Sequence, residues 1–373
     1  MRSKSTLELR QRVGQLLIMG FDGTTVSARL RLMLATLCPG GIILFKRNIE
    51  GAVQTHVLLS ATQKAATTRM FLCVDMEGGM VDRLRNVIAP VPSVAEVVAA
   101  GSKKLCRAHG RLLGEEVHAL GFNTDFAPVL DLQFEASKGV LASRTVSADP
   151  RQTVTYAREF LRGLREASVL GCGKHFPGLG EANLDSHNEL PSIAKPWKRL
   201  WSEDLRPYRE LRQELPFVMV AHAAYPEVTG DRTPASLSNK WISDVLRKKI
   251  GYRALIIADD LDMGGVLAAT SIEGAAVETL RAGADMFLVC QKEESVWRAF
   301  EAVYKQAEGD RKFAQLVAEK SRRVLAAKRS SRPLKARMAP SPTQRTVDRL
   351  RRRIWEFSEE MRAQSITASG VPA

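Results

Sequence analysis

The chain has 373 residues, 45% of them hydrophobic, which is enough to bury a large core as one α/β barrel or as two ordinary domains. No apolar run reaches the roughly 18 residues of a membrane-spanning helix, so a spanning helix is excluded, and we expect no membrane partner. The polar start, Met1 to Arg12, lacks the apolar region of a secretory signal, and we expect a cytoplasmic protein. The five cysteines are widely spaced and mostly set in apolar runs, which indicates buried free thiols.

The formal net charge of +14 is concentrated near the end of the chain. Residues 328–353 contain ten basic side chains and one acid, Asp348, a local net charge of +9. We interpret this segment as a solvated, partly disordered helix. The alternative is weak attraction to nucleic acid or to another anionic surface, and we do not expect nucleic acid to be a partner.

Short apolar runs alternate along the chain with helical stretches, a pattern typical of a parallel sheet built from βα units. Eight such runs occur, namely Gln15–Gly20, Gly41–Phe45, Met70–Val74, Asn123–Ala127, Val169–His175, Phe217–Ala221, Ala254–Ala258 and Asp285–Cys290. Helical periodicity is clearest in Arg151–Ala167, Asn239–Lys249 and Ile272–Ala282. An open doubly wound sheet would accommodate eight strands, but eight repeats are also what a closed barrel requires, and we predict a (β/α)8 TIM-type barrel.

We expect the barrel to occupy residues 1–328 and a basic linker with a terminal helix to occupy residues 329–373. Ser330–Pro342 is rich in Ser, Pro and basic residues, as a linker would be, and Thr346–Ala363 is amphipathic.

Polar residues follow the apolar runs. In a barrel, catalytic groups stand at the carboxyl ends of strands, so these side chains should converge on one mouth. They are Asp75, Glu77, Asp131, Lys174, His175, His222, Asp259 and Asp260.

The segment Gly173–His187 begins on a strand and continues as a glycine-rich loop. Lys174 and His175 would donate hydrogen bonds to a polyhydroxylated or anionic ligand, or else form an ordinary strand end. Asp185 and His187 are two residues apart, so in an extended loop they lie on the same side. The carboxylate could then hold one imidazole nitrogen and leave the other for acid/base work, although an isolated pair of this kind is more often a loop interaction without chemistry.

In a second segment, Ala254–Met263, four apolar residues lead into Asp259, Asp260 and Asp262. A carboxylate on a rigid strand end suits a nucleophile that attacks an anomeric carbon. The alternative is a metal site with hard oxygen ligands, but consecutive strand residues point in opposite directions, so one of Asp259 and Asp260 should lie outside the cavity.

A third segment, Asp75–Arg83, also follows a strand directly. Asp75 could accept hydrogen bonds from two sugar hydroxyls, and Arg83 could hold either Asp75 or the ligand. Its glycine spacing matches neither the Walker A nor the dinucleotide pattern, which argues against a nucleotide site.

Taken together, these motifs resemble the glycoside hydrolase family 3 β-N-acetylglucosaminidases of bacterial peptidoglycan recycling, over Leu9–Lys328. The ordered motifs are Gly40–Phe45 with Arg47 and Asn48, Asp75–Leu84, Asn123–Asp131, Lys174–His187, Pro234–Ser238, Asp259–Met263 and Ala282–Asp285.

The resemblance implies that Asp259 is the nucleophile and that His187, beside Asp185, is the acid/base. It also implies that Asp75, Arg83, Arg144, Lys174 and His175 bind the sugar. The implied reaction is a retaining two-step displacement on small N-acetylglucosaminyl muropeptides that needs no cofactor or metal. Another family 3 glycosidase activity remains an alternative. Phosphorolysis is also an alternative, because a neutral acid/base admits an anionic acceptor.

The chain departs from the family pattern at three positions. Leu179 stands where the family usually has His, and Met76 and Met80 replace the typical Gln and Arg. Because Leu179 lies in the loop that carries His187, a non-catalytic sugar-binding protein is a further alternative.

Overall fold

The computed structural model describes residues 4–182 and 189–369, and within them eight parallel strands form one ring. Their order is β6-β3-β2-β1-β10-β9-β8-β7. Parallel bridges from Thr124 to Leu170 and from Val129 to Lys174 join the segments of β6 and β7 and close the ring. The strands are β1 (Leu17–Met19), β2 (Gly41–Ile43), β3 (Phe71–Val74), β6 (Thr124–Asp125), β7 (Cys172–Phe176), β8 (Phe217–Val220), β9 (Leu255–Asp260) and β10 (Met286–Val289).

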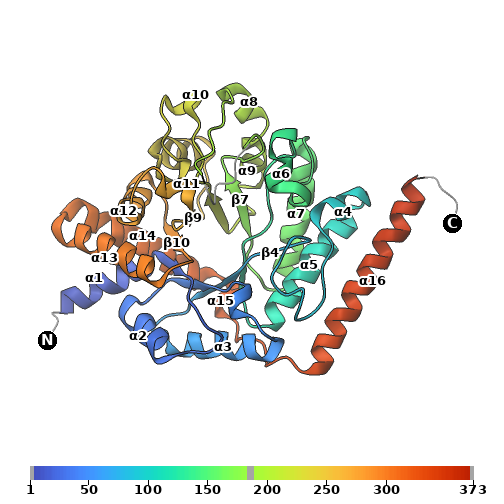
Figure 1. Cartoon of the computed structure of the whole chain (residues 1–373), viewed down its shortest axis with the longest axis horizontal. Helices are drawn as coiled ribbons and strands as arrows, with labels where there is room; N and C mark the ends of the chain where they lie inside the picture. Colours follow the sequence, from blue (N-terminus) through green and yellow to red (C-terminus); the bar gives the residue numbers. More distant parts are fainter. Residues whose placement is uncertain (1–3, 183–188, 370–373) are drawn as a thin grey trace.

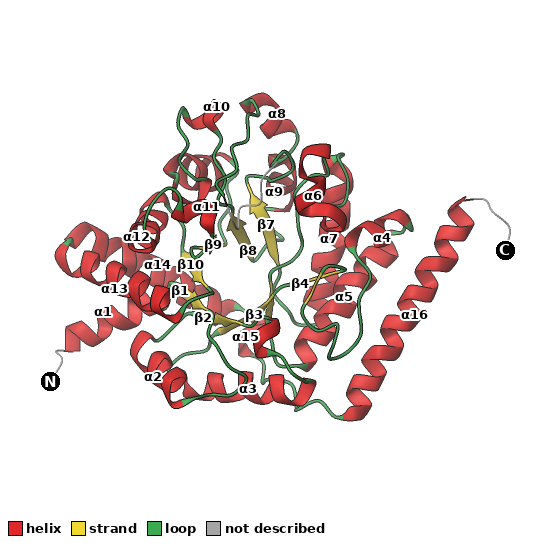
Figure 2. Cartoon of the chain, in the orientation of Figure 1, coloured by secondary structure: helices red, strands yellow, loops and turns green. Residues whose placement is uncertain are grey.

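Helices surround this ring of strands on the outside (Figures 1 and 2). The longer ones are α1 (Lys4–Gly14), α2 (Ala28–Leu37), α3 (Ala52–Ala65), α5 (Lys103–Ala119), α7 (Pro150–Glu166), the π-helix η5 (Lys240–Lys249), α12 (Ile272–Ala282), α13 (Glu293–Gly309) and α14 (Arg311–Ser330). The predicted (β/α)8 barrel is confirmed. Each of the eight predicted runs overlaps one strand, and the three clearest helical stretches are helices.

Shorter elements occupy the connections. They are η1 (Lys46–Asn48), α4 (Val94–Ala99), η2 (Glu135–Ser137), α6 (Lys138–Leu141), η3 (Ala142–Arg144), α8 (Trp197–Ser202), α9 (Leu205–Leu211), α10 (Pro226–Thr229), η4 (Ala235–Leu237), α11 (Gly264–Leu267) and α15 (Arg332–Lys335). A two-stranded antiparallel hairpin of β4 (Met76–Gly78) and β5 (Val81–Asp82) follows β3.

Local sequence signals set the helix boundaries. α7 begins where the Asp149 side chain accepts a hydrogen bond from the Arg151 amide, with Pro150 at the first helical position. α12 begins at Ser271, whose side chain caps the Gly274 amide, and ends at Gly283, whose φ of 121° suits glycine. The barrel strands are buried except at Asp259 in β9, which is half-buried, as in a sheet covered by helices. An edge-on contact of Phe71 with Phe217 (centroids 5.0 Å apart) lies inside the ring.

The terminal helix α16 (Gln344–Ser369) lies beside α5 on the outside of the barrel (Figure 1). A terminal helix was predicted, but as a solvated and partly disordered one. Instead, one face is buried because it carries apolar residues at helical spacing, namely Val347, Leu350, Ile354, Phe357 and Met361. The division of the chain at residue 328 stays a prediction.

Two further expectations concern cysteines and membranes. All five cysteines are buried free thiols, as predicted. None of the helices within residues 4–182 and 189–369 has the length and apolarity to cross a membrane.

Candidate active site

A cavity of about 180 Å³ lies over the carboxyl ends of the barrel strands. Six residues proposed from the sequence line it together: Asp75, Arg83, Arg144, Lys174, His175 and Asp259. Phe45, Glu77, Met263 and Gln291 also line it. Strand-end polar residues thus meet at one mouth, although the chemical role of each remains a prediction.

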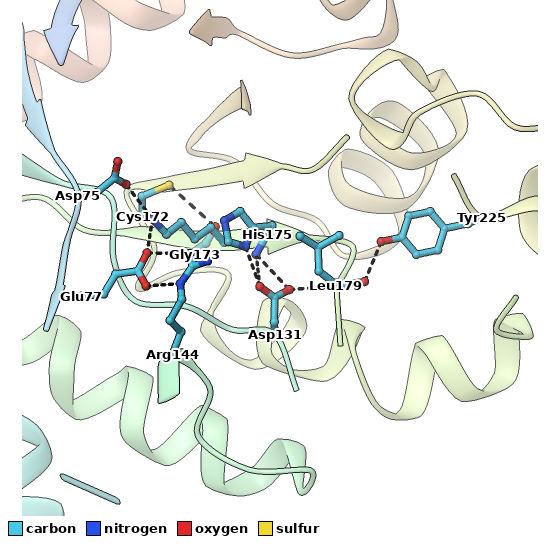
Figure 3. A network of polar contacts seen from close by, with 11 residues as sticks. Asp75, Glu77, Asp131, Arg144, Cys172, Gly173, His175, Leu179 and Tyr225 are labelled. Atoms are coloured by element: carbon cyan, nitrogen blue, oxygen red, sulfur yellow. Dashed lines mark hydrogen bonds and ion pairs between the residues drawn. The ribbon is translucent and has the colours of Figure 1, made fainter. Parts of the chain in front are cut away.

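Glu77 is the centre of a buried ionic network (Figure 3). Arg144 donates to its carboxylate from Nε (2.7 Å) and Nη2 (3.0 Å). Lys174 Nζ lies 2.6 Å from Glu77 Oε1 and 2.8 Å from Asp75 Oδ1. Burial disfavours a charged Glu77, but Arg144 and Lys174 overcome it and hold the pKa of this carboxyl far below its usual range. Two cations are therefore fixed at the cavity wall.

Asp131 binds His175, which follows Lys174 in β7 (Figure 3). The imidazole Nδ1 of His175 lies 2.7 Å from Asp131 Oδ2, and the backbone amide of Leu179 donates to Asp131 Oδ1 at 2.7 Å. Farther along, Tyr225 Oη donates to the Gly178 carbonyl at 2.7 Å. One carboxylate thus orients the imidazole and the start of the following loop at the same time.

Both Asp259 and Asp260 line the cavity, although strand alternation predicted that one of them lies outside it, and their carboxylates have different surroundings. Asp260 Oδ1 accepts hydrogen bonds from the amides of Asp262 (3.1 Å) and Cys290 (2.9 Å), and burial raises its pKa to about 6. The Asp259 carboxylate lines the cavity and accepts only the Asp260 amide among the described contacts, at 2.8 Å. Burial opposes its ionisation, but the charges of His175 and His222 outweigh burial and lower the pKa of Asp259.

Arg83 lines the cavity, and its guanidinium is 6.0 Å from the centre of the Phe45 ring. The sequence left open whether Arg83 holds Asp75 or the ligand. Lys174 is the described ion-pair partner of Asp75, which leaves the Arg83 side chain facing the cavity.

Asp185 and His187, the predicted acid/base pair, lie outside the described residues. The residues on either side are held by ionic contacts. Lys195, which is 1% exposed, places Nζ 3.3 Å from Glu181, 2.7 Å from Glu203 and 2.5 Å from Asp204. Arg199 also pairs with Glu181, at 3.0 Å. The chain is thus anchored both before and after the segment that carries the pair.

Comparison with known proteins assigns the family. The model of the glycosyl hydrolase family 3 N-terminal domain matches residues 8–327. The chain belongs to glycosyl hydrolase family 3. The prediction that it is a glycoside hydrolase is confirmed.

Relatives within family 3 include β-hexosaminidases. That of Pseudomonas aeruginosa strain LESB58 is 37% identical over 292 residues, which cover 77% of this chain and 86% of the relative. That of Idiomarina loihiensis is 34% identical over 278 residues, which cover 74% of this chain and 83% of the relative.

Solved family 3 structures have the same fold. A β-N-acetylglucosaminidase from Paenibacillus sp. str. FPU-7 superposes with a TM-score of 0.89 at 31% identity, over 95% of this chain and 68% of that one. Native NagZ from Neisseria gonorrhoeae superposes with a TM-score of 0.72 at 26% identity, over 94% of this chain and 96% of that one.

The three departures from the family 3 pattern are accommodated differently. Leu179 is buried in an apolar cluster and lines the cavity, while its backbone amide binds Asp131. Met76 is fully buried, and its sulfur accepts the Arg83 amide at 3.2 Å. Met80 is 65% exposed and does not line the cavity. Of the three residues, only Leu179 therefore lines the cavity, whereas Met76 contacts the backbone of Arg83, which lines it.

The carboxylates considered as metal ligands are engaged by the backbone. Asp262 Oδ2 accepts the amides of Gln291 and Lys292 at 3.0 and 3.1 Å, and Asp260 is bound as described above. In residues 4–182 and 189–369, no three His, Cys, Asp or Glu side chains are grouped as a metal would require.

Sequence reasoning gave no role to Glu77 or Asp131, although both were recognised as strand-end residues. Their importance lies in their partners, which come from distant parts of the chain: Arg144 is 67 residues from Glu77, and His175 is 44 residues from Asp131. Their strand-end positions and their places in the motifs Asp75–Leu84 and Asn123–Asp131 were the available signals.

Proposed function

We propose that this family 3 enzyme is a retaining exo-β-N-acetylglucosaminidase that removes terminal N-acetylglucosamine from peptidoglycan fragments in the cytoplasm. The observation that carries the proposal is the Asp259 carboxylate. It faces the cavity at the end of a rigid strand, and two histidines lower its pKa, so it is ionised at neutral pH as a nucleophile must be.

The size and polarity of the cavity support a single sugar ring as its occupant. Its volume of about 180 Å³ is below the roughly 300–1,000 Å³ of sites for drug-sized ligands. Arg144, Lys174 and His175 offer donors to hydroxyl or carbonyl oxygens, and Asp75 offers an acceptor. A small pocket of this kind favours the end of a chain over its middle, in agreement with exo action.

The proposed reaction has two steps. An Asp259 oxygen attacks the anomeric carbon while the glycosidic C–O bond breaks, and His187, oriented by Asp185, gives a proton to the leaving oxygen. His187 then takes a proton from water, which attacks the same carbon and releases Asp259. The roles of His187 and Asp185 rest on the Asp-Ser-His motif that the chain shares with the family.

A chromogenic N-acetyl-β-glucosaminide tests the proposal. We expect turnover by the native chain and loss of turnover in Asp259→Ala, with sugar binding retained. Full activity in Asp259→Ala would contradict the assignment of the nucleophile. Binding without turnover by the native chain would instead indicate a sugar-binding protein.

The same assay, run with and without inorganic phosphate, separates hydrolysis from phosphorolysis. We expect free N-acetylglucosamine as the product in both conditions. Formation of the sugar 1-phosphate would identify a phosphorylase.

A substrate panel with good and poor leaving groups tests His187. His187→Ala should slow poor leaving groups more than activated phenols, because an activated phenol needs no proton. Equal losses on both would remove the acid role.

A further inference from the structure

The terminal helix α16 contacts the segment that follows the β4–β5 hairpin. Arg351 donates from Nε to the Ile88 carbonyl (2.8 Å) and from Nη2 to the Val87 carbonyl (3.4 Å). Both residues belong to a turn in which their amides bind the Leu84 carbonyl, at 2.9 and 2.8 Å. A side chain of the terminal helix therefore fastens this turn.

Hydrogen bonds connect this turn and the residues after it to the β4–β5 hairpin. Asp82, in β5, accepts the amides of Leu84 and Val91 on its two carboxylate oxygens, each at 3.0 Å. The Gly79 amide donates to the Val91 carbonyl at 2.9 Å. Displacement of the turn would therefore be transmitted to the hairpin through these three bonds.

A second contact connects α16 to the hairpin through His109. The Phe357 ring stacks on the His109 imidazole, with centroids 5.9 Å apart and planes at 7°. His109 is completely buried, and its Nε2 would be 3.0 Å from a β-carbon on Gly78. Gly78 has a φ of 82°, a conformation that glycine adopts without strain, and it directly follows Glu77.

We propose that α16 is a positioning element for the cavity, with Arg351 and Phe357 as its positioning residues. Neither residue lines the cavity. They act through the turn and through His109 to hold the hairpin, and with it Glu77, which fixes Arg144 and Lys174. The inference rests on the proposed function, because it assigns these two cations to sugar binding. A small displacement of such groups weakens ligand binding even though no contact to the ligand is removed.

The chain offers a matched pair of variants. Arg351 and Arg352 are exposed neighbours on one helix, so Arg351→Ala and Arg352→Ala remove the same charge and have the same helix propensity. Arg351→Lys keeps the positive charge and provides one donor nitrogen in place of the two that contact the Ile88 and Val87 carbonyls.

We expect Arg351→Ala to raise KM for the chromogenic substrate roughly three- to tenfold, the loss of about one hydrogen bond. The value of kcat should change less than KM, and Arg352→Ala should match the native chain. Arg351→Lys should recover part of the lost affinity. Phe357→Leu, which keeps the apolar volume but not the stacked ring, should raise KM in the same direction.

Hydrogen–deuterium exchange of residues 76–92 gives a readout that does not depend on turnover. We expect faster exchange there in Arg351→Ala than in Arg352→Ala. Unchanged exchange, or faster exchange and a lower melting temperature with unchanged KM, would overturn the inference and leave α16 a structural brace. Absence of turnover in the native chain would contradict the proposed function alone, since the exchange comparison would still test the link from α16 to the hairpin.

Discussion

Glu77 and Arg144 form a two-point ion pair, with Nε and Nη2 of the guanidinium 2.7 and 3.0 Å from the two carboxylate oxygens. The Glu77 side chain is 1% exposed and the Arg144 side chain 17%. Because Lys174 shares the same carboxylate, one buried anion fixes two cations of the cavity. A carboxylate can in this way determine the shape of a sugar site through the cations that it holds.

Replacing Glu77 with Gln should therefore affect both stability and binding. The variant keeps the shape but removes the carboxylate charge that pairs with both Arg144 and Lys174, so we expect a loss of about 3–5 kcal/mol in the free energy of unfolding. We expect kcat/KM to fall at least about tenfold, or ~1.4 kcal/mol. The exposed Glu50→Gln serves as the control in denaturant melts and kinetics. Native-like values for Glu77→Gln would show that the network is dispensable.

His175→Gln should move the acidic limb of the pH profile. Asp259 must be ionised to attack, and its lowered pKa keeps it ionised as the pH falls toward its ordinary range. His175→Gln removes an electrostatic interaction that lowers the pKa of Asp259, so the acidic loss of kcat/KM should begin at a higher pH. The diagnostic quantity is the position of the limb, since the lost sugar contact lowers the whole curve. A limb at the same or a lower pH would exclude this electrostatic link.

Lys195→Met should destabilise the fold strongly. The ammonium is buried against three carboxylates, and Asp204 is itself 2% exposed, with burial raising its pKa to about 6 even in the presence of Lys195. Removing the cation leaves buried negative charge without compensation, at a cost of about 3–5 kcal/mol. Lys198→Met, on the exposed neighbour, should be close to neutral. Equal melting temperatures for Lys195→Met and Lys198→Met would contradict the prediction.

Leu179→His tests whether the departure from the family pattern impairs the loop. The Leu179 side chain is 5% exposed in an apolar cluster, and its contact to Asp131 uses the backbone amide, which any residue provides. We expect no gain in kcat and a loss of about 1–3 kcal/mol in stability from burying an unpaired imidazole. A tenfold rise in kcat would instead show that Leu179 limits the native enzyme.

The barrel could be predicted because its signals are local. Each strand is a short apolar run and several helices carry their own caps, such as Asp149 and Ser271. The position of a polar residue at a strand end then follows from topology, which brought Asp75, Lys174 and Asp259 to one mouth.

Pairings between distant residues were harder to predict. Nothing near Glu77 in the sequence indicates that its partner is Arg144, since the two meet only after the barrel closes. The buried face of α16 is similar. Its amphipathic spacing predicts a helix, but the excess of basic residues favoured a solvated, partly disordered one, and only the fold reveals that Phe357 meets His109.

The nucleophile is the central claim, and a covalent label tests it most directly. A slow 5-fluoro N-acetylglucosaminyl substrate that accumulates the glycosyl-enzyme should be incubated with the native chain, digested and mapped by mass spectrometry. We predict one added sugar on Asp259. A label on Asp260 or any other residue, or turnover with no label under conditions that trap an intermediate, would contradict it.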